Sequence, residues 1–439
     1  MGWVNLNIRE KIQLTGICLF LLTLPYNREI NQLFLVLFLL SSAPCINRSS
    51  WQRNKKAIFI FTAIFGIVLL SCLYDPDLTL ALKKVEIKLA LLLVPFIFGA
   101  SYTPSNYKND AIWIAFITGV CSALLYLLVY FIIHMRGLHL PVSQWLKQQY
   151  LNHQYSKPID IHAGFFSCYV SLCLFALISF LFKKSDRFIR TGILLLMALC
   201  LISLFLLTSR SVLILTFGCL LCFTPFVLKR VSWYASATFG LAAAGLIYFF
   251  MTRSNYFEER FTGELNKDVK LSQLTHAVED HSNDLKGSIL KNDGTRIERW
   301  VASMELIKKR PLLGYGAGQE KPQLWKKYEE LGLTVSLEQH YDSHNQFISY
   351  TITSGILGLI AFVVLLVFAF IHAFRARSFL YITFLILVTG TCLIDTFLEV
   401  NKGVFFFAFF NVFLYMTSPV SPKARPAGQE GLLVPFHRP

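Results

Sequence analysis

Charged residues are scarce in this sequence. They make up 15% of its 439 residues, while hydrophobic residues make up 55%. An average soluble domain has about 25% charged residues, and the deficit here comes from apolar runs that recur along the chain. The composition therefore excludes an ordinary soluble domain and indicates a membrane protein.

Cysteine is absent from the long polar stretch of the chain. All ten cysteines lie within or at the end of apolar runs, and none lies between residues 252 and 344. This placement argues against a disulfide framework, and we interpret the cysteines as small buried hydrophobic residues. Cys219 and Cys222 have CxxC spacing, but their setting, "LTFGCLLCFTPF", offers no other sign of a redox or zinc site.

A metal-binding motif is also lacking. The sequence has no HExxH, although His340 and His344 are four residues apart and would share one face of a helix. Two histidines, even with Asp342, do not complete a zinc site, because such a site usually takes more protein ligands. We therefore predict no metal and no cofactor, and we expect His340 to be a solvated loop residue.

The sequence is instead rich in long apolar runs. Crossing a bilayer takes about 20 mostly apolar residues. The runs that approach this length lie at residues 12–26, 31–46, 57–74, 83–100, 111–134, 161–182, 188–208, 211–228, 233–251, 346–372, 378–395 and 402–418. A second run follows the first almost at once, so we expect a transmembrane helix there and not a cleavable signal peptide. The sequence thus predicts an all-α polytopic membrane protein with about twelve transmembrane helices.

The net charge of +15 follows the same pattern. Most Lys and Arg lie in every second short loop, such as "RNKK" at residues 53–56. The positive-inside rule places these loops and both termini in the cytoplasm, so the charge calls for no nucleic-acid partner. The expected organisation is transmembrane helices 1–9 over residues 1–251, a large periplasmic loop over 252–345, helices 10–12 over 346–418, and a cytoplasmic tail over 419–439.

The second half of the predicted loop contains signals for two helices. Apolar residues spaced by three and four in "TRIERWVASMELIKKR" predict a helix. Thr295 and Glu298 would open it with a capping box, and Pro311 would end it. The glycines of "GYGAGQ" then predict a tight turn, since a phosphate-binding loop would follow a strand. The segment "KPQLWKKYEELG" predicts the second helix.

Polar residues at the outer ends of the apolar runs are candidates for a site. Arg210 interrupts "LFLLTSRSVLILTF" on the outer side, where it either reaches lipid headgroups or binds a phosphate through its planar fork. His162 begins another run. Asp395 and Glu399 end a third run, where they would cap a helix, pair with Lys402 or take part in a site.

Several segments, taken in order, resemble the O-antigen ligase and polymerase superfamily. They are "SR" closing one run, "RIERW" and "PLLGYGAG" in the outer loop, "SHNQFISYTITSGILGL" opening the next run, and "IDTFLEVNKGVFFFAFFNVFL" near the end. Together they cover roughly residues 195–418. The resemblance implies a glycosyltransferase of the GT-C type in the bacterial inner membrane. Such an enzyme takes a glycan from undecaprenyl pyrophosphate on the periplasmic side, inverts the anomeric centre and needs no metal.

The resemblance also implies roles for individual residues. The family's arginine at the outer end of a span matches Arg210, and its R-x-x-x-W arginine matches Arg296, with Trp300 in place. Its histidine followed by asparagine matches His344 and Asn345. Cationic side chains near the pyrophosphate would stabilise the charge of the leaving group, and an imidazole could accept the proton of the acceptor hydroxyl.

Asn345 and Trp300 are expected to bind substrate, together with three further residues. The family's acid in the last outer loop resembles Asp395 or Glu399, and His162 lies at the outer start of its own run. The implied partners are an undecaprenyl-pyrophosphate-linked glycan, membrane lipid, and either the lipid A core, for a ligase, or another lipid-linked repeat unit, for a polymerase. We favour the ligase slightly.

A flippase or transporter is the alternative from a different class. It would require internal inverted repeats and charged residues near the middle of the bilayer. The sequence shows neither, because its notable polar residues gather at the outer ends of the apolar runs.

Overall fold

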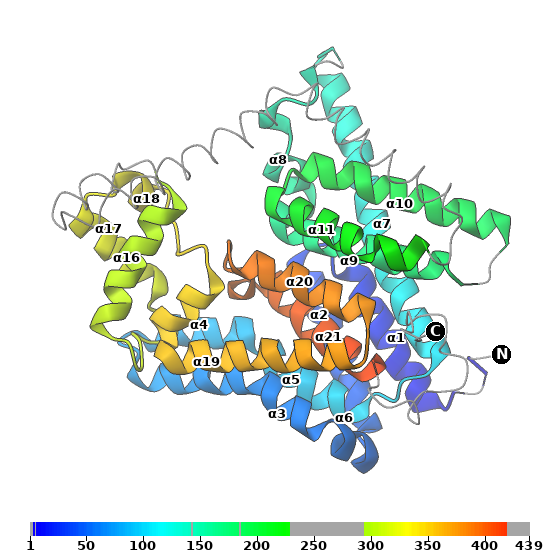
Figure 1. Ribbon diagram of the computed structural model, residues 1–439, viewed down its shortest axis with the longest axis horizontal. Helices are drawn as coiled ribbons and strands as arrows, with labels where there is room; N and C mark the ends of the chain where they lie inside the picture. Colours follow the sequence, from blue (N-terminus) through cyan, green and yellow to red (C-terminus); the bar gives the residue numbers. More distant parts are fainter. Residues whose placement is uncertain (1–2, 5, 142–143, 184–185, 229–293, 419–439) are drawn as a thin grey trace.

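The computed structural model describes the chain apart from residues 1–2, 5, 142–143, 184–185, 229–293 and 419–439 (Figure 1). Within the described residues every regular element is a helix, which confirms the predicted all-α class. The ninth predicted span at 233–251, the first part of the predicted periplasmic loop and the predicted tail lie outside the described residues.

Five helices are long and apolar enough to cross a membrane. They are α3 (Arg48–Ser71), which a short 3-10 turn extends to Tyr74, α7 (Asn106–Gly137), α9 (Ala163–Leu181), α10 (Arg187–Leu207) and α19 (Gln346–Arg375). These helices coincide with the apolar runs at 57–74, 111–134, 161–182, 188–208 and 346–372. The structure therefore supports a polytopic membrane protein.

The other predicted spans within the described residues do not give a helix that meets both conditions, so the count of twelve stays a prediction. Their helices are α1 (Ile8–Thr23), α2 (Arg28–Ser42), α11 (Arg210–Leu228), α20 (Phe379–Cys392) and α21 (Asn401–Thr417). The run at 83–100 is divided among α4 (Leu78–Lys88), α5 (Ala90–Leu93), a π turn (Val94–Phe98) and α6 (Gly99–Ser101). Before this division, Lys84 and Lys88 of α4 both pair with the carboxylate of Glu399, so they face a polar partner and not an apolar surrounding.

Aromatic side chains fill the core around α21, whose residues from Asn401 to Leu414 are all buried. The ring of Phe409 lies 5.7 Å from Phe20, 5.9 Å from Phe38 and 5.2 Å from Phe98, between ring centroids. Pairs at such distances add to the stability that burial gives. The C-terminal helix is thereby fixed against α1, α2 and the broken segment after α4.

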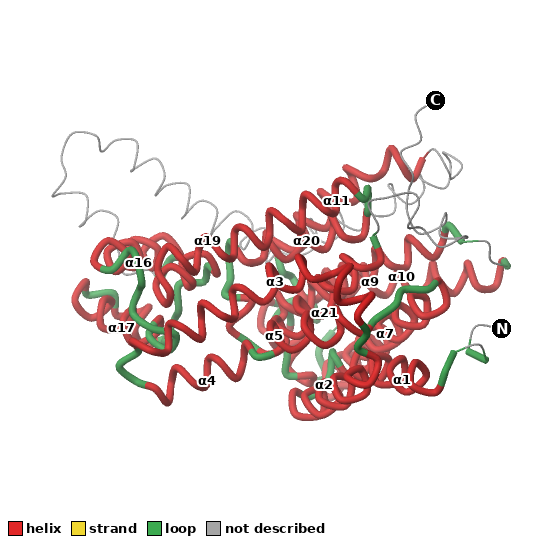
Figure 2. Tube along the Cα trace, turned by 90° about the horizontal axis from the view of Figure 1, so that it is seen from below, coloured by secondary structure: helices red, strands yellow, loops and turns green. Residues whose placement is uncertain are grey.

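Helices α16 (Arg296–Lys309) and α17 (Glu320–Leu331), which we call the outer helices, lie where α19 begins. Figures 1 and 2 both show them at that end of α19, while α3 packs beside α19. Thr295 and Glu298 form the predicted capping box, at 3.4 and 3.1 Å. The helix ends before Pro311, and α17 coincides with the second predicted helix, so both predicted helices are confirmed.

A break in α19 receives the segment that follows α16. Gly355 has φ 65° inside the helix, and a side chain there would meet the Leu312 carbonyl oxygen at 2.1 Å. The carbonyls that the break frees on Ile352 and Thr353 accept the N–H groups of Tyr315 and Gly316, at 2.9 and 3.0 Å. The first turns of α19 are thus joined to the outer helices by backbone hydrogen bonds.

The glycine-rich turn of "GYGAGQ" binds a carboxylate of the protein itself. Gly314 and Gly316 have φ of 73° and 116°, as the predicted tight turn requires. The Gly318 N–H donates to Asp75 Oδ2 at 2.7 Å, and Gln319 Nε2 donates to Asp75 Oδ1 at 2.8 Å. This contact ties the start of α17 to the loop between α3 and α4.

Candidate active site

His344 lies on a turn directly before α19, next to Asp342. Its Nδ1 is 2.5 Å from Asp342 Oδ1, and its backbone N–H donates to the same oxygen at 2.9 Å. The hydroxyl of Thr396 donates to the other oxygen at 3.0 Å. Asp342 is therefore held from two sides, by its own turn and by the loop after α20.

Asp342 fixes the orientation of the imidazole. Burial acts to raise the pKa of Asp342, but the hydrogen bond and charge of His344 outweigh it and leave the pKa well below its ordinary value. An ionised Asp342 favours the tautomer with the proton on Nδ1, because that N–H can then donate to the carboxylate. The Nε2 atom of His344 is left with a lone pair that can accept a proton.

The backbone of His344 is in an uncommon conformation. Its φ is 47°, in the left-handed region that side chains other than glycine seldom adopt. Trp300 Nε1 donates to the Ser343 carbonyl at 3.0 Å and so holds the turn against α16. A conformation of this kind persists where surrounding contacts over-determine it, and such positions cluster at functional sites.

Asn345 serves as the N-cap of α19. Its Oδ1 accepts the N–H groups of Phe347 and Ile348, at 2.9 and 3.2 Å, and its Nδ2 donates to the Leu393 carbonyl at 2.9 Å. Its amide is thus engaged by backbone on both sides. Like Trp300, Asn345 has contacts that position the His344 turn, and a direct contact of either residue with substrate stays a prediction.

Arg296 begins α16 on the same side of the molecule. Burial raises the pKa of Asp395, and the charges of His344 and Arg296 partly offset that rise. The Nε of Arg296 is buried and has no hydrogen-bond partner among the described residues. A buried guanidinium N–H without a partner is costly, which makes Arg296 suited to an anionic ligand.

His162 approaches the same group from α9. Its Nδ1 lies 3.8 Å from Asp395 Oδ2, and its ring lies 4.1 Å from that of His153. Although its side chain is 44% exposed, partial desolvation by neighbouring groups and the charge of His344 lower the pKa of His162. His162 is therefore neutral near pH 7, and the structure brings it together with Asp395 and the His344 turn.

Arg210 is the first residue of α11 and is half-buried. Its neighbour Ser209 packs on the start of α9: a methyl group added at Gly164 would lie 3.6 Å from Ser209 Oγ and 3.3 Å from His162 Nδ1. The turn that carries Arg210 therefore adjoins His162. The described contacts thus bring the backbone of Arg210 to the site.

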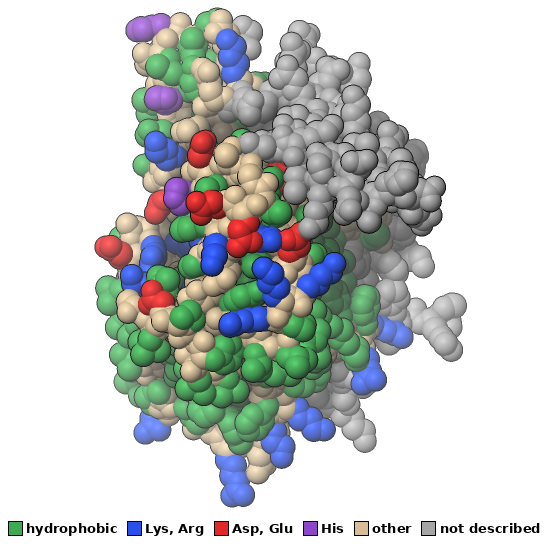
Figure 3. Space-filling view, turned by 90° about the vertical axis from the view of Figure 1, so that its left-hand side faces the viewer, with side chains coloured by type: hydrophobic (Ala, Val, Ile, Leu, Met, Phe, Trp, Pro, Cys, Tyr) green, Lys and Arg blue, Asp and Glu red, His purple; other side chains and the backbone are tan. Residues whose placement is uncertain are grey.

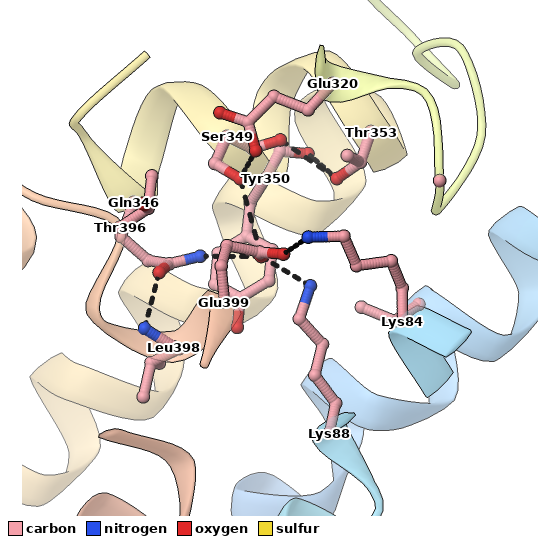
Figure 4. A network of polar contacts seen from close by, with 12 residues as sticks. Lys84, Lys88, Glu320, Gln346, Ser349, Tyr350, Thr353, Thr396, Leu398 and Glu399 are labelled. Carbon is pink, nitrogen blue, oxygen red and sulfur yellow. Dashed lines mark hydrogen bonds and ion pairs between the residues drawn. The ribbon is translucent and has the colours of Figure 1, made fainter. Parts of the chain in front are cut away.

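Glu399 is buried in a separate charged cluster, which Figure 4 shows. Its carboxylate pairs with Lys84 at 2.7 Å and with Lys88 at 2.6 Å. Burial would raise its pKa, but the two lysines outweigh burial and lower the pKa to about 2. An ion pair with Lys402, which the sequence left open, is wrong, because Lys402 Nζ donates to the carbonyls of Leu24 and Tyr26.

The described residues contain one group whose ligand atoms are close enough for a metal, namely Cys121, Cys173 and Cys200, all within 4.8 Å of one another. They come from α7, α9 and α10, within the helices and apart from the histidines. Buried thiols in such apolar surroundings pack as small hydrophobic groups. His340, for its part, contacts the Trp325 ring at 4.8 Å and the Glu338 carbonyl, not His344.

Sequence reasoning missed several residues around the site. Asp342 was considered only as a metal ligand, although the spacing in "DSH" allows a carboxylate to reach the following imidazole. Glu320, Lys84 and Lys88 gave no local signal beyond the four-residue spacing of the two lysines. His153 was not singled out, since its partner His162 lies across a loop.

Comparison with known proteins bears on the central part of the chain. Residues 194–363 match the family model described as O-antigen ligase, while a comparison with curated proteins finds no match. The matched segment runs from α10 into α19 and contains Arg210, Arg296 and His344. Members of this family are membrane glycosyltransferase-like enzymes. Over residues 194–363 the chain is therefore similar to the O-antigen ligase family, which supports its resemblance to the O-antigen ligase and polymerase superfamily.

Proposed function

We propose that this protein is a ligase-type glycosyltransferase of the bacterial inner membrane. It would move a glycan from undecaprenyl pyrophosphate to a hydroxyl of the lipid A core, on the periplasmic side. The observation that carries the proposal is the contact of His344 with Asp342 at 2.5 Å, near Asp395, whose pKa the charges of both His344 and Arg296 act to lower. This contact lies within the segment that matches the O-antigen ligase family.

His344 acts as the general base in this proposal. The acceptor hydroxyl must lose its proton as its oxygen attacks the anomeric carbon, and His344 Nε2 can take that proton. Asp342 supports the imidazole by holding Nδ1–H and by stabilising the positive charge that forms on the ring. The side chain of His344 is 27% exposed, which leaves room for an acceptor sugar to approach it.

Arg296 and Arg210 stabilise the leaving group. Negative charge gathers on the pyrophosphate as the glycosidic bond breaks, and fixed guanidinium groups offset that charge without a metal ion. The buried Nε of Arg296, which has no partner among the described residues, supports this role. Direct attack by the acceptor on the carrier-linked sugar inverts the anomeric centre.

Replacement of His344 by alanine tests the proposal, with His340→Ala as the matched control. His340 is four residues away and also has positive φ, at 53°, but it lacks a carboxylate partner among its described contacts. In a strain that lacks its own copy of this protein, we expect His344→Ala to abolish glycan-capped lipopolysaccharide on gels and His340→Ala to retain it.

The lipid carrier distinguishes the related outcomes. Full-length polymer that accumulates on undecaprenyl pyrophosphate in the His344→Ala strain supports a ligase. Lipopolysaccharide capped with a single repeat unit indicates a polymerase instead. A normal ladder in the His344→Ala strain contradicts both, and glycan that fails to cross the membrane in that strain indicates a flippase.

A further inference from the structure

Glu320 connects two serines that flank His344. It begins α17, and its Oε1 accepts the hydroxyl of Ser343 at 2.6 Å and the N–H of Ser343 at 3.3 Å. Its Oε2 accepts the hydroxyl of Ser349 at 2.6 Å, a contact visible in Figure 4. One carboxylate therefore holds the residue before His344 and the fourth residue of α19.

Glu320 is too buried to reach a substrate. It is 3% exposed, and both of its serine partners are 0% exposed. A buried carboxylate is unfavourable unless hydrogen bonds or ion pairs compensate it. Here three donors from the His344 turn and α19 supply the compensation, so the charge of Glu320 is tied to the conformation of that turn.

The conformation held in this way is the one that places His344. Ser343 contacts Glu320 through its side chain, while its carbonyl accepts Trp300 Nε1 at 3.0 Å. His344 follows with φ of 47°, a backbone state that its own side chain does not favour. We call the hydrogen bonds of Glu320 to Ser343 and Ser349 the clamp. Without the clamp the turn would relax toward commoner conformations, and the contact between His344 Nδ1 and Asp342 would be lost in many molecules.

The clamp is anchored beyond α17. Ser349 Oγ lies 3.5 Å from Glu399 Oε1, and Gln346 Nε2 donates to the same oxygen at 3.2 Å (Figure 4). Gln346 Oε1 accepts the Leu398 N–H at 2.7 Å. The first turn of α19 is thus bonded to α17 on one side and to the loop after α20 on the other.

We propose that Glu320 is a positioning residue for His344: its ionised carboxylate, held by Ser343 and Ser349, keeps the left-handed turn in which His344 meets Asp342. The effect on catalysis rests on the proposed function, in which His344 is the base. The effect on the conformation of the turn does not, and it can be measured separately.

The test compares Glu320→Ala and Glu320→Gln with the control variant Glu330→Ala. Glu330 lies near the other end of α17 and pairs with Lys327 at 3.1 Å. Transfer is measured with the full chain in detergent and a lipid-linked glycan. We expect Glu320→Ala to lower kcat by about 10- to 100-fold, as for a misplaced catalytic group, with KM for the donor unchanged. Glu320→Gln should recover part of kcat, because its amide oxygen still accepts one hydroxyl.

A second measurement follows the turn directly. Diethyl pyrocarbonate modifies accessible imidazoles, and mass spectrometry gives the rate at each histidine. We expect Glu320→Ala to raise the rate at His344 severalfold and to leave the rate at His340 unchanged, while Glu330→Ala changes neither. If Glu320→Ala fails to fold, the double variant Ser343→Ala with Ser349→Ala removes the two hydroxyl hydrogen bonds to Glu320 and should give the same two effects.

The outcomes separate the clamp from the proposed function. Unchanged kcat and unchanged His344 reactivity in Glu320→Ala would overturn the clamp. A raised KM with normal kcat would also overturn it, because Glu320 would then contribute to substrate binding. If the wild-type protein transfers no glycan, the proposed function fails, yet faster modification of His344 in Glu320→Ala still supports the clamp and an unchanged rate still refutes it.

Discussion

Two charged groups lie side by side at the start of α19 and differ in how completely their charges are matched. Glu399 and Lys88 have side chains that are 6% and 1% exposed and lie 2.6 Å apart, with Lys84 as a second cation. In the other group His344 and His162 are 27% and 44% exposed, and Arg296 has a buried Nε without a partner in the described part of the chain.

The difference separates structure from chemistry. Buried charges that satisfy one another hold elements together, since removing one partner leaves the other uncompensated. Charges that keep accessible atoms are available to a ligand, and perturbed carboxylates beside histidines are typical of functional sites. The resemblance placed Glu399 with the site residues, whereas its contacts place it with the framework. Three substitutions and a change of pH test this difference.

The largest expected effect is on stability, from Glu399→Ala. It leaves Lys84 and Lys88 buried without their anion, and the loss of one partner of a buried ion pair costs about 3–5 kcal/mol. We expect little folded protein in membranes, measured by fluorescence-detected size exclusion. The triple variant Lys84→Met, Lys88→Met, Glu399→Leu should restore much of it. Normal folding of Glu399→Ala would show that the cluster is not structural.

Asp342→Asn should affect activity more than folding. An asparagine at this position no longer stabilises an imidazolium and can hold the wrong tautomer of His344, so we expect a loss of about 100-fold or more in kcat. Steady-state transfer assays measure kcat, and thermal unfolding in detergent measures stability. A variant with wild-type kcat would remove the reason for treating His344 and Asp342 as a unit.

Gly355→Ala should disturb both groups moderately. Alanine at this position has to adopt a positive φ, which is a backbone strain of about 1–3 kcal/mol. In addition, its side chain meets the Leu312 carbonyl. We expect a lower Tm together with reduced kcat, because the break in α19 joins the outer helices to the turn. Gly66→Ala in the neighbouring α3 is the control, because φ is not positive there and an added side chain would have open space; equal effects in both variants would argue against the special role of the break.

The smallest effect concerns pH. Burial raises the pKa of Glu320 to about 6 from an ordinary value of 4.5, with nearby Asp342 adding to the rise. The folded state binds this proton more tightly than the unfolded state, so the contribution to stability is complete below pH 4.5 and is lost as pH rises through 6. The expected loss is about 1–2 kcal/mol. Relative to Glu320→Gln, the wild-type Tm should fall between pH 4.5 and 7; a parallel dependence would contradict the assignment.

Local signals were sufficient for much of the fold near the site. The capping box at Thr295, the end of α16 before Pro311 and the positive φ of Gly314 and Gly316 all involve residues within a few positions of one another. Hydrophobic spacing and caps act over single turns, so the sequence alone predicts them. The five long apolar helices follow from composition for the same reason.

The candidate site was predicted in part. The resemblance singled out Arg210, Arg296 and His344 by their places in recognisable segments, and the matched family segment contains all three. It could not supply Asp342 as the partner of His344, since this contact is made through a turn with positive φ that no local motif predicts. Nor could it assign Glu399, whose partners Lys84 and Lys88 are more than 300 residues distant.

The sequence alone indicates a helical membrane protein that resembles the O-antigen ligase and polymerase superfamily, because apolar length and short ordered motifs are properties of contiguous residues. Only the tertiary structure decided which charges neutralise one another and which stay accessible. That decision depends on long-range packing: α4, α17, α19 and the loop after α20 meet at one place, and burial there makes each unmatched charge costly.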